Sequence, residues 1–180
     1  MASEPAALRT EPARPPARHH SFILLLGLVV LPILVLDQAT KHFVSTRMAL
    51  YEDIPIIPNF LDITYTQNSG AAFSIFTGLP PWFRLGFLVS LAIVAIVVLL
   101  ALMYHAERIN LSSIAFALIF AGALGNLIDR ALNSGRVIDF VRAHYYDLSY
   151  PVFNTADSAI SVGVALIILA SLVGAKKVEQ

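Results

Sequence analysis

The chain has 180 residues, of which 57% are apolar and 13% charged, and its twelve Lys and Arg balance twelve Asp and Glu. Soluble domains have about 45–50% apolar and about 25% charged residues, so this chain has too few polar side chains to cover a water-facing surface. The composition excludes a disordered chain, a collagen and a basic nucleic-acid binder. The absence of cysteine excludes disulfides, thiolate zinc sites and cysteine nucleophiles. A membrane domain is therefore indicated.

Four segments, taken in chain order, are apolar over close to the ~20 residues that a helix needs to cross a bilayer. Residues 1–20, rich in Pro and Arg, predict a disordered tail, which leaves residues 21–175 as one transmembrane domain. We expect membrane helices over residues 21–44, 82–104, 111–132 and 152–174. The first follows basic residues, as in a signal peptide, but no small-residue cleavage site comes after it. We therefore expect it to be retained, with Pro32 inside it.

The loops between these segments differ in length and in their structural signals. The first loop, residues 45–81, contains the β-branched and aromatic run 61–66, which predicts a small sheet at the membrane surface. The third loop, residues 133–151, mixes apolar and polar residues, and we expect a short interfacial helix there. The second loop has only about six residues.

The distribution of charge leaves the membrane orientation open. Four spans place both termini on one side, and six Lys and Arg then fall on each side of the membrane, so the positive-inside rule does not decide. The acidic residues are asymmetric, because eight of the twelve fall on the side of the two long loops. Chemistry that depends on charge is therefore expected on that side.

Five groups of polar residues lie within or beside the predicted spans, all on the side of the long loops. Ionisable groups at such positions are costly and are candidates for functional sites. The groups are Asp37 with Lys41, Asn68 with Ser69 and Gly70, Gly122 and Gly125 with Asn126, Asp129 and Arg130, then Asp139, and finally Asn154 with Asp157. Five coincidences on one membrane face favour a shared site.

Each group also has a purely structural explanation. Asp37 and Lys41, four residues apart on a helix, are explained by an ion pair. The asparagine and glycine at 68 and 70 are typical of a turn, and the two glycines of the third span are typical of close helix packing. Asp157 is the hardest to explain in this way, although an acidic residue near a helix start also serves as a cap.

The motifs exclude several classes of catalysis. The chain has no His-Glu-x-x-His zinc motif, no Gly-x-Ser-x-Gly nucleophile elbow and no phosphate-binding glycine loop. Carboxylate chemistry remains, because two aspartates brought together raise the pKa of one of them and can then act as base and acid. Asp139 and Asp157, 18 positions apart, are the candidate pair, although the sequence does not show that they meet.

The five groups, in this order and spacing, resemble lipoprotein signal peptidase, the bacterial signal peptidase II family. The resemblance covers about residues 22–174, with Ala121 where a glycine is expected. It implies an all-α membrane protein of four transmembrane helices with a small extracytoplasmic β-cradle in the first loop. It also implies an aspartic endopeptidase of the bacterial inner membrane, with both termini cytoplasmic and the active site on the extracytoplasmic side. Such enzymes remove the signal peptide from diacylglyceryl-modified prolipoproteins by cutting before the lipidated cysteine.

The resemblance assigns a role to each matching position. Asp139 and Asp157 form the catalytic dyad, and five residues bind substrate or orient the dyad, namely Asn68, Gly70, Asn126, Arg130 and Asn154. Asp37, Lys41 and Asp129 support the site. The family needs no metal or other cofactor. Expected partners are diacylated prolipoproteins and membrane lipid, with no nucleic acid, and we expect a monomer.

Two other functions remain open from the residues themselves. Intramembrane Asp, Asn and Arg also mark proton-coupled carriers and ion pathways. A carrier is disfavoured because the polar groups gather at one side and the middle of the second span, residues 91–102, has no polar residue. A structural four-span subunit without activity is the third interpretation.

Overall fold

The computed structural model of this protein describes residues 18–70, 80–146 and 148–178. The helical elements are α1 (Arg18–Leu25), the π-helical turn η1 (Leu26–Val30), α2 (Leu31–Arg47), α3 (Pro81–Tyr104), α4 (Leu111–Leu132) and α5 (Thr155–Val178). The strands are β1 (Asp53–Ile57), β2 (Leu61–Asn68), β3 (Val137–Tyr145) and β4 (Leu148–Ser149). The predicted disordered tail lies outside the described residues up to residue 17, whereas residues 18–20 belong to α1.

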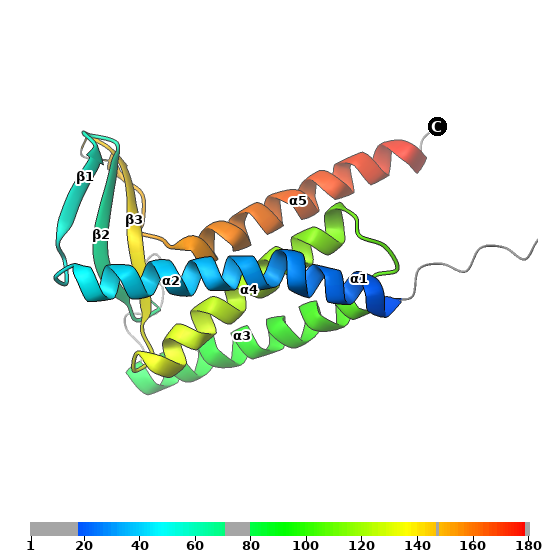
Figure 1. Cartoon of the computed structure of the whole chain (residues 1–180), viewed down its shortest axis with the longest axis horizontal. Helices are drawn as coiled ribbons and strands as arrows, with labels where there is room; N and C mark the ends of the chain where they lie inside the picture. The colour runs from blue at the N-terminus through cyan, green and yellow to red at the C-terminus, as the bar shows by residue number, and fades with distance from the viewer. Residues whose placement is uncertain (1–17, 71–79, 147, 179–180) are drawn as a thin grey trace, which may run out of the picture.

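Within the described part of the chain, four helices are long and apolar enough to cross a membrane (Figure 1). The first runs through α1, η1 and α2, and the others are α3, α4 and α5. The four predicted spans are confirmed, with boundaries that differ by a few residues. α5 begins at Thr155, a few residues later than predicted, because Phe153 just before it forms a bridge with Val141 of β3.

Pro32 is accommodated inside the first span by a wider helical turn. The N–H of Leu31 donates to the carbonyl of Leu26, five residues earlier, which is the hydrogen bond of a π-turn. Pro32 lies in the first turn of α2 and has no N–H to donate. The helix therefore continues past the proline without a break, as the sequence predicts.

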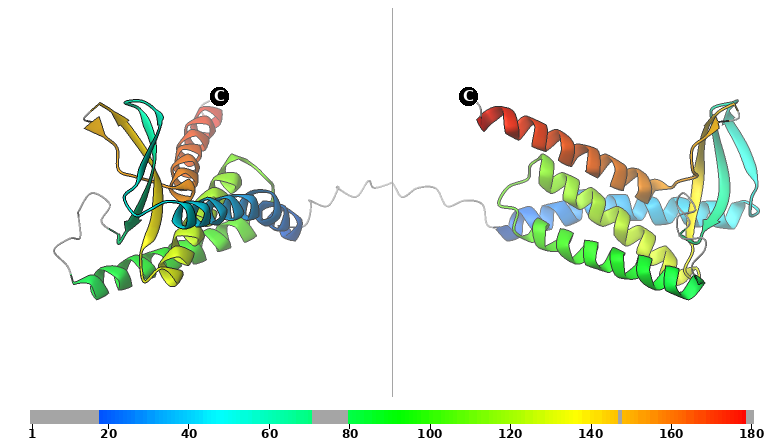
Figure 2. Two further views of the ribbon diagram at one scale, coloured as in Figure 1. Left: turned by 60° about the vertical axis from the view of Figure 1, so that its left-hand side comes forward. Right: turned by 180° about the vertical axis from the view of Figure 1, so that it is seen from behind.

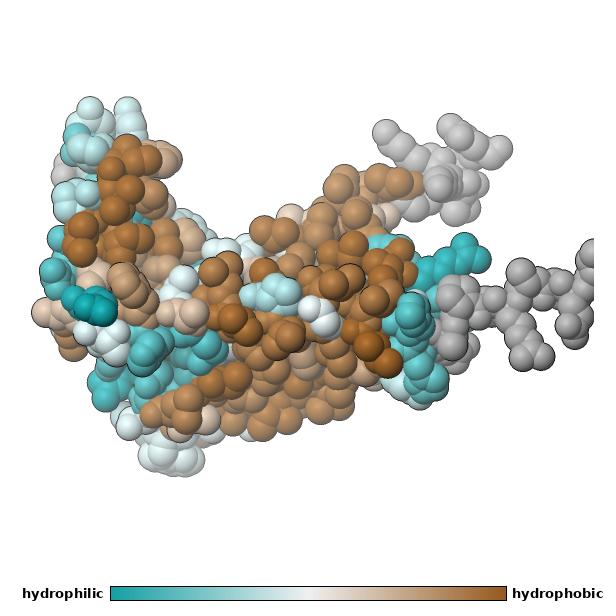
Figure 3. Space-filling view, in the orientation of Figure 1, coloured by the Kyte–Doolittle hydropathy of each residue, from teal (hydrophilic) through white to brown (hydrophobic). Residues whose placement is uncertain are grey.

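α4 lies at the centre of the bundle and contacts α2, α3 and α5. Small buried residues let its neighbours approach closely, and a Cβ added to Gly122 would collide with the carbonyl oxygen of Ala156 on α5. The outward faces of the helices carry exposed apolar side chains, which form the brown surface of Figure 3. This surface matches contact with lipid tails.

An antiparallel sheet closes one end of the bundle (Figure 2). Its strand order is β1-β2-β3-β4, so it joins the first long loop to the third. β2 pairs with β3 from Leu61 opposite Ala143 to Asn68 opposite Val137. The strand predicted at 61–66 is therefore confirmed, and β2 extends it to Asn68.

The expectation of a short interfacial helix in the third loop is wrong, because residues 137–145 form strand β3. The apolar residues there follow a period of two rather than a helical period. Ile138 and Phe140 pack into an apolar cluster with Val44 and Tyr65, whereas Asp139 between them lines a cavity on the other side of the strand. The free edge of β2 supplies the partner that stabilises this strand.

Candidate active site

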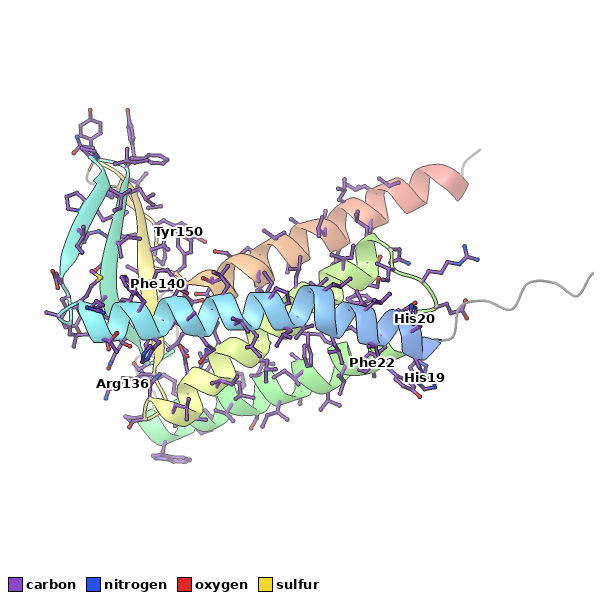
Figure 4. All side chains as sticks on the ribbon, in the orientation of Figure 1. His19, His20, Phe22, Arg136, Phe140 and Tyr150 are labelled. Atoms are coloured by element: carbon purple, nitrogen blue, oxygen red, sulfur yellow. The ribbon has the colours of Figure 1, made fainter. Side chains whose placement is uncertain are left out.

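A cavity of about 430 Å³ lies where the sheet meets the ends of α3, α4 and α5. Four elements supply its polar lining, which consists of Thr66 and Asn68 of β2, Asn126 and Arg130 of α4, Asp139 of β3 and Asp157 of α5. Apolar residues complete the wall, including Tyr150, which Figure 4 labels between the sheet and α5. Polar groups that converge in a partly apolar hollow are typical of an active site.

Asp139 is buried in this wall, with only 2% of its surface exposed. Its Oδ2 accepts a hydrogen bond from Nδ2 of Asn68 (3.0 Å), and its Oδ1 accepts one from Nδ2 of Asn154 (2.7 Å). Burial, followed by the negative charge of Asp157, raises the pKa of Asp139 to about 7. Asp139 is therefore able to hold a proton near neutral pH, as a general acid must.

Asn154 and Asp157 cap the start of α5 reciprocally. Oδ1 of Asn154 accepts from the backbone N–H of Asp157 (2.9 Å), and Oδ2 of Asp157 accepts from the backbone N–H of Asn154 (3.3 Å). The structural explanation of Asp157 as a cap is thus correct, but Asp157 also lines the cavity. Because Asn154 also donates to Asp139, one buried residue holds both carboxyl groups.

Asn126 links Asp157 to a buried charge. Its Nδ2 donates to Oδ1 of Asp157 (2.8 Å), and its Oδ1 accepts from Nδ2 of Asn154 (3.2 Å) and from Nζ of Lys41 (3.1 Å). A neighbouring cation requires the amide oxygen to face Lys41, so the amide nitrogen must face Asp157. The orientation of this amide is therefore determined by its surroundings.

Lys41 is the centre of an ionic network behind the cavity. Its Nζ lies 2.8 Å from Oδ2 of Asp37 and 3.0 Å from Oδ2 of Asp129, and Asn126 is its third acceptor. These three acceptors match the three donors of an ammonium group, which is necessary because only 2% of Lys41 is exposed. The predicted pairing of Asp37 with Lys41 is confirmed, and Asp129 joins it.

The two carboxylates of this network also bind the backbone next to the candidate dyad. Oδ1 of Asp37 accepts from the N–H of Ala156 (2.9 Å), the residue before Asp157. Oδ2 of Asp129 accepts from the N–H of Ile138 (3.0 Å), the residue before Asp139. The network therefore positions the backbone on which each aspartate is carried.

Gln38 belongs to this network, although the sequence did not single it out. Its Nε2 donates to Oδ2 of Asp37 (3.1 Å) and to Oδ1 of Asp129 (3.2 Å). An uncharged amide gives little signal in a sequence. The one feature that could have indicated Gln38 is its position three residues before Lys41, because this spacing places the Gln38 and Lys41 side chains near one face of the helix.

Two glycines are required by the site. A Cβ at Gly125 would lie 2.6 Å from Oδ2 of Asp37, so this glycine lets the carboxylate approach the backbone of α4. Gly70 has a φ of +95°, and its N–H donates to Oδ1 of Asn68 (2.8 Å) in the turn predicted there. A side chain at 70 would also collide with Leu88 at the cavity wall.

Arg130 brings a positive charge to the cavity. Its Nη1 donates to the carbonyl of Asn126 (3.1 Å), one turn earlier on α4. Its Nε is buried and makes no hydrogen bond within the described residues. The guanidinium therefore has donors left for a carbonyl oxygen of a bound ligand.

The structure brings together every residue that the sequence selected. Asn68, Gly70, Asn126, Arg130, Asp139 and Asp157 line the cavity, and Asp37, Lys41, Asp129 and Asn154 lie directly behind it. Among the described residues, no group of three or more His, Asp or Glu side chains is arranged to hold a metal ion. The chemistry that this arrangement supports is general acid–base catalysis by two carboxyl groups.

Comparison with known proteins decides the family. The family model described as signal peptidase (SPase) II matches residues 29–173. The chain belongs to the signal peptidase II family. It is therefore an aspartic peptidase of the membrane, and enzymes of this family remove signal peptides from prolipoproteins.

Relatives and solved structures agree with this assignment. The lipoprotein signal peptidase of Staphylococcus haemolyticus is 40% identical over 88% of this chain and 97% of its own. That of Geobacter sulfurreducens is 46% identical over 77% of this chain and 86% of its own. A solved structure of a bacterial membrane enzyme, 37% identical, superposes with a TM-score of 0.72 over 84% of this chain and 94% of its own. The carrier and the inactive subunit are not favoured by these likenesses.

Proposed function

We propose that Asp139 and Asp157 are the catalytic dyad with which this peptidase hydrolyses the signal-peptide bond of prolipoproteins. The observation that carries the proposal is that both carboxyl groups line one cavity while a single buried residue, Asn154, hydrogen-bonds to each. The raised pKa of Asp139 keeps a proton on it near neutral pH. Asp157 accepts hydrogen bonds from two N–H groups and is assigned the role of base.

The chemistry follows from these two protonation states. Asp157 takes a proton from a water molecule between the two carboxyl groups, and the water oxygen attacks the scissile carbonyl carbon. Asp139 gives its proton to the carbonyl oxygen, which yields a neutral tetrahedral intermediate. Collapse of this intermediate breaks the C–N bond. One of its two hydroxyl groups returns a proton to Asp139 as the C=O bond forms again, and the proton held by Asp157 passes to the leaving amine. No metal takes part in this scheme.

The remaining polar groups hold the dyad and the substrate. Asn68 and Asn154 donate to Asp139, and Asn126 donates to Asp157, so each carboxyl group is fixed without an added charge. Arg130 is assigned to a carbonyl oxygen of the bound peptide, because its buried Nε makes no hydrogen bond within the described residues. Gly70 at the cavity wall leaves room for the peptide backbone.

The position of the cavity supports a lipid-modified substrate. The cavity is lined by residues of the sheet and of α3, α4 and α5. The sheet lies at one end of the apolar bundle (Figure 2), and we assign the mouth of the cavity to the level of the membrane surface. A peptide bond next to a diacylglyceryl-cysteine can enter there while its two acyl chains stay in the bilayer. We therefore assign diacylglyceryl-modified prolipoproteins as substrates, cut before the lipidated cysteine.

The sidedness of the enzyme forms part of the same proposal. The start of α1 and the end of α5 lie at the end of the bundle opposite the sheet (Figure 1). We assign this end to the cytoplasm and the sheet with its cavity to the extracytoplasmic side of a bacterial inner membrane. All the site residues come from one chain, which supports activity as a monomer.

The test uses purified protein in detergent and a diacylglyceryl-modified prolipoprotein, with signal-peptide removal followed as a mobility shift. Asp139→Asn and Asp157→Asn should each abolish cleavage while their thermal unfolding stays cooperative. Asp62→Asn is the matched control, because Asp62 is a buried carboxylate on β2 that pairs with Arg142 rather than with the cavity. Near-normal cleavage by either dyad variant would show that the dyad is wrongly assigned. Cleavage of unmodified prolipoprotein at the same rate would refute the lipid requirement.

A further inference from the structure

A second, smaller cavity of about 190 Å³ lies between the start of α3 and the turn that follows α4. Two arginines line it, Arg84 on the first turn of α3 and Arg136 just before β3, together with the hydroxyl-bearing residues Ser69 and Ser134. Figure 4 labels Arg136 near the end of the bundle that carries the sheet. The signal peptidase reaction described above uses none of these residues.

Among the residues that the structure describes, no carboxylate pairs with the two arginines of this cavity. Within the described residues, neither the Arg84 nor the Arg136 guanidinium forms an ion pair or a side-chain hydrogen bond. Residues 71–79, which come before α3, contain no Asp or Glu in their sequence. Asp129, the carboxylate on α4 that precedes this turn in the sequence, is already paired with Lys41. Two arginines in one hollow without a counter-charge indicate a site for an anion.

The backbone around the cavity holds the two arginines in place. Ser134 and Gly135 adopt positive φ values of 53° and 84°, which form a tight left-handed turn after α4. The N–H of Gly135 donates to the carbonyl of Arg130 (2.9 Å), and a Cβ at Gly135 would lie 2.9 Å from Cδ2 of Leu85. The turn is therefore pressed against the first turn of α3. The N-terminus of α3 adds the positive end of its helix dipole to the same place.

The position of the cavity relative to the membrane indicates the source of the anion. Trp82 lines it and is 74% exposed, and it stands at the first turn of a 24-residue apolar helix. Exposed tryptophans at the ends of membrane helices lie at the level of the lipid headgroups. Phospholipid headgroups carry their phosphates at this level, and basic pockets between membrane helices bind such headgroups.

We propose that this cavity binds the phosphate headgroup of an anionic phospholipid, with Arg84 and Arg136 as its cationic ligands. The site is separate from the active site but adjacent to it, because Leu88, one turn beyond Arg84 on α3, lines the catalytic cavity. A bound headgroup joins α3 to the turn after α4 and so fixes one wall of that cavity. The proposal does not depend on the assignment of the dyad.

The test measures the thermal unfolding of the full chain in detergent micelles with added phosphatidylglycerol, phosphatidylcholine of the same acyl chains, or inorganic phosphate. At about 100 times its dissociation constant, phosphatidylglycerol should raise Tm by about 5–10 °C, and the other two should not. The Arg84→Gln, Arg136→Gln double variant should lose this difference. Arg108→Gln, an exposed arginine at the other end of α3, is the matched control and should keep it.

Each alternative result has a definite meaning. An equal Tm shift with phosphatidylcholine would show that charge is not recognised, and an equal shift with inorganic phosphate would show that the lipid is not needed. An undiminished Tm shift with phosphatidylglycerol in the double variant would place the lipid elsewhere. Any one of these three results overturns the proposal. If the double variant does not fold, Arg136→Gln alone serves, because this side chain is exposed. It should reduce the shift by about half, by loss of one of the two cationic ligands.

Discussion

The replacement Asn154→Ser separates the two tasks of a single buried residue. As the cap of α5, Asn154 accepts from the N–H of Asp157 (2.9 Å), and a serine hydroxyl at this position can accept the same bond. As a partner of the proposed dyad, its Nδ2 donates to Oδ1 of Asp139 (2.7 Å), and serine is too short to do so. The variant should therefore keep the helix start and release one restraint on Asp139.

The expected size of the effect follows from the hydrogen bond that is lost. A hydrogen bond to a charged group contributes about 1.5–3 kcal/mol and one to a neutral group about 0.5–1.5 kcal/mol. The Asn154 amide therefore favours the ionised form of Asp139 over the protonated form by about 1–1.5 kcal/mol, which is about one pKa unit. The pKa of Asp139 is about 7 in the wild type, so Asn154→Ser should move it to about 8.

The assay is the pH dependence of kcat/KM for cleavage of a diacylated prolipoprotein. Asp139 must be protonated to act as the acid, so activity falls as pH rises through its pKa. Asn154→Ser should shift this alkaline limb upward by about one unit. The matched control is Asn110→Ser, which changes the capping asparagine of α4 at the other end of the bundle and should leave the limb in place. An unshifted limb in a folded Asn154→Ser variant would refute the role given to this amide.

Three further results are expected from thermal unfolding. Lys41→Met leaves two buried carboxylates without their cation and should destabilise the fold by about 3–5 kcal/mol; an unchanged Tm would contradict the buried network. Gly125→Ala places a Cβ 2.6 Å from a carboxylate of α2 and should cost about 1–3 kcal/mol, whereas Gly86→Ala, with no atom within 4 Å, should be neutral or stabilising. The Arg142 hydrogen bond lowers the pKa of Asp62 from 3.8. The wild type should therefore have a larger free energy of unfolding than Asp62→Asn above pH 3.8, and this difference should vanish as pH falls below that value. A pH-independent difference would contradict this pairing.

The spans could be predicted because their signal is contained in composition and length. Each of the four is an apolar run close to ~20 residues long, and no tertiary contact is needed to identify it. The pairing of Asp37 with Lys41 was also accessible, because a spacing of four on a helix fixes the distance between the two side chains. Such local periodic features are the part of this fold that a single sequence specifies.

The third loop could not be predicted correctly because its structure depends on a distant partner. Residues 137–145 contain apolar and polar residues that suit either an interfacial helix or a strand, and only the edge of β2 decides between them. The meeting of Asp139 with Asp157 depends on this strand, so the sequence alone could select the two aspartates without placing them together. Gln38 was missed for a related reason, since its partners Asp37 and Asp129 converge only in three dimensions.

The pairing of β2 with β3 also determines when, during synthesis, hydrolysis can begin. Asn68 and Asp139 bond across 71 residues, and both α3 and α4 lie between them in the chain. At about 5–20 residues per second, the ribosome needs about 4–14 s to make that interval. Until then Asp139, the first of the two aspartates proposed as the dyad, does not exist in the polypeptide, and Asp157 follows it later still. We therefore expect a nascent chain with only its first two spans inserted to be inert, and cleavage to start only when translation has reached the last helix.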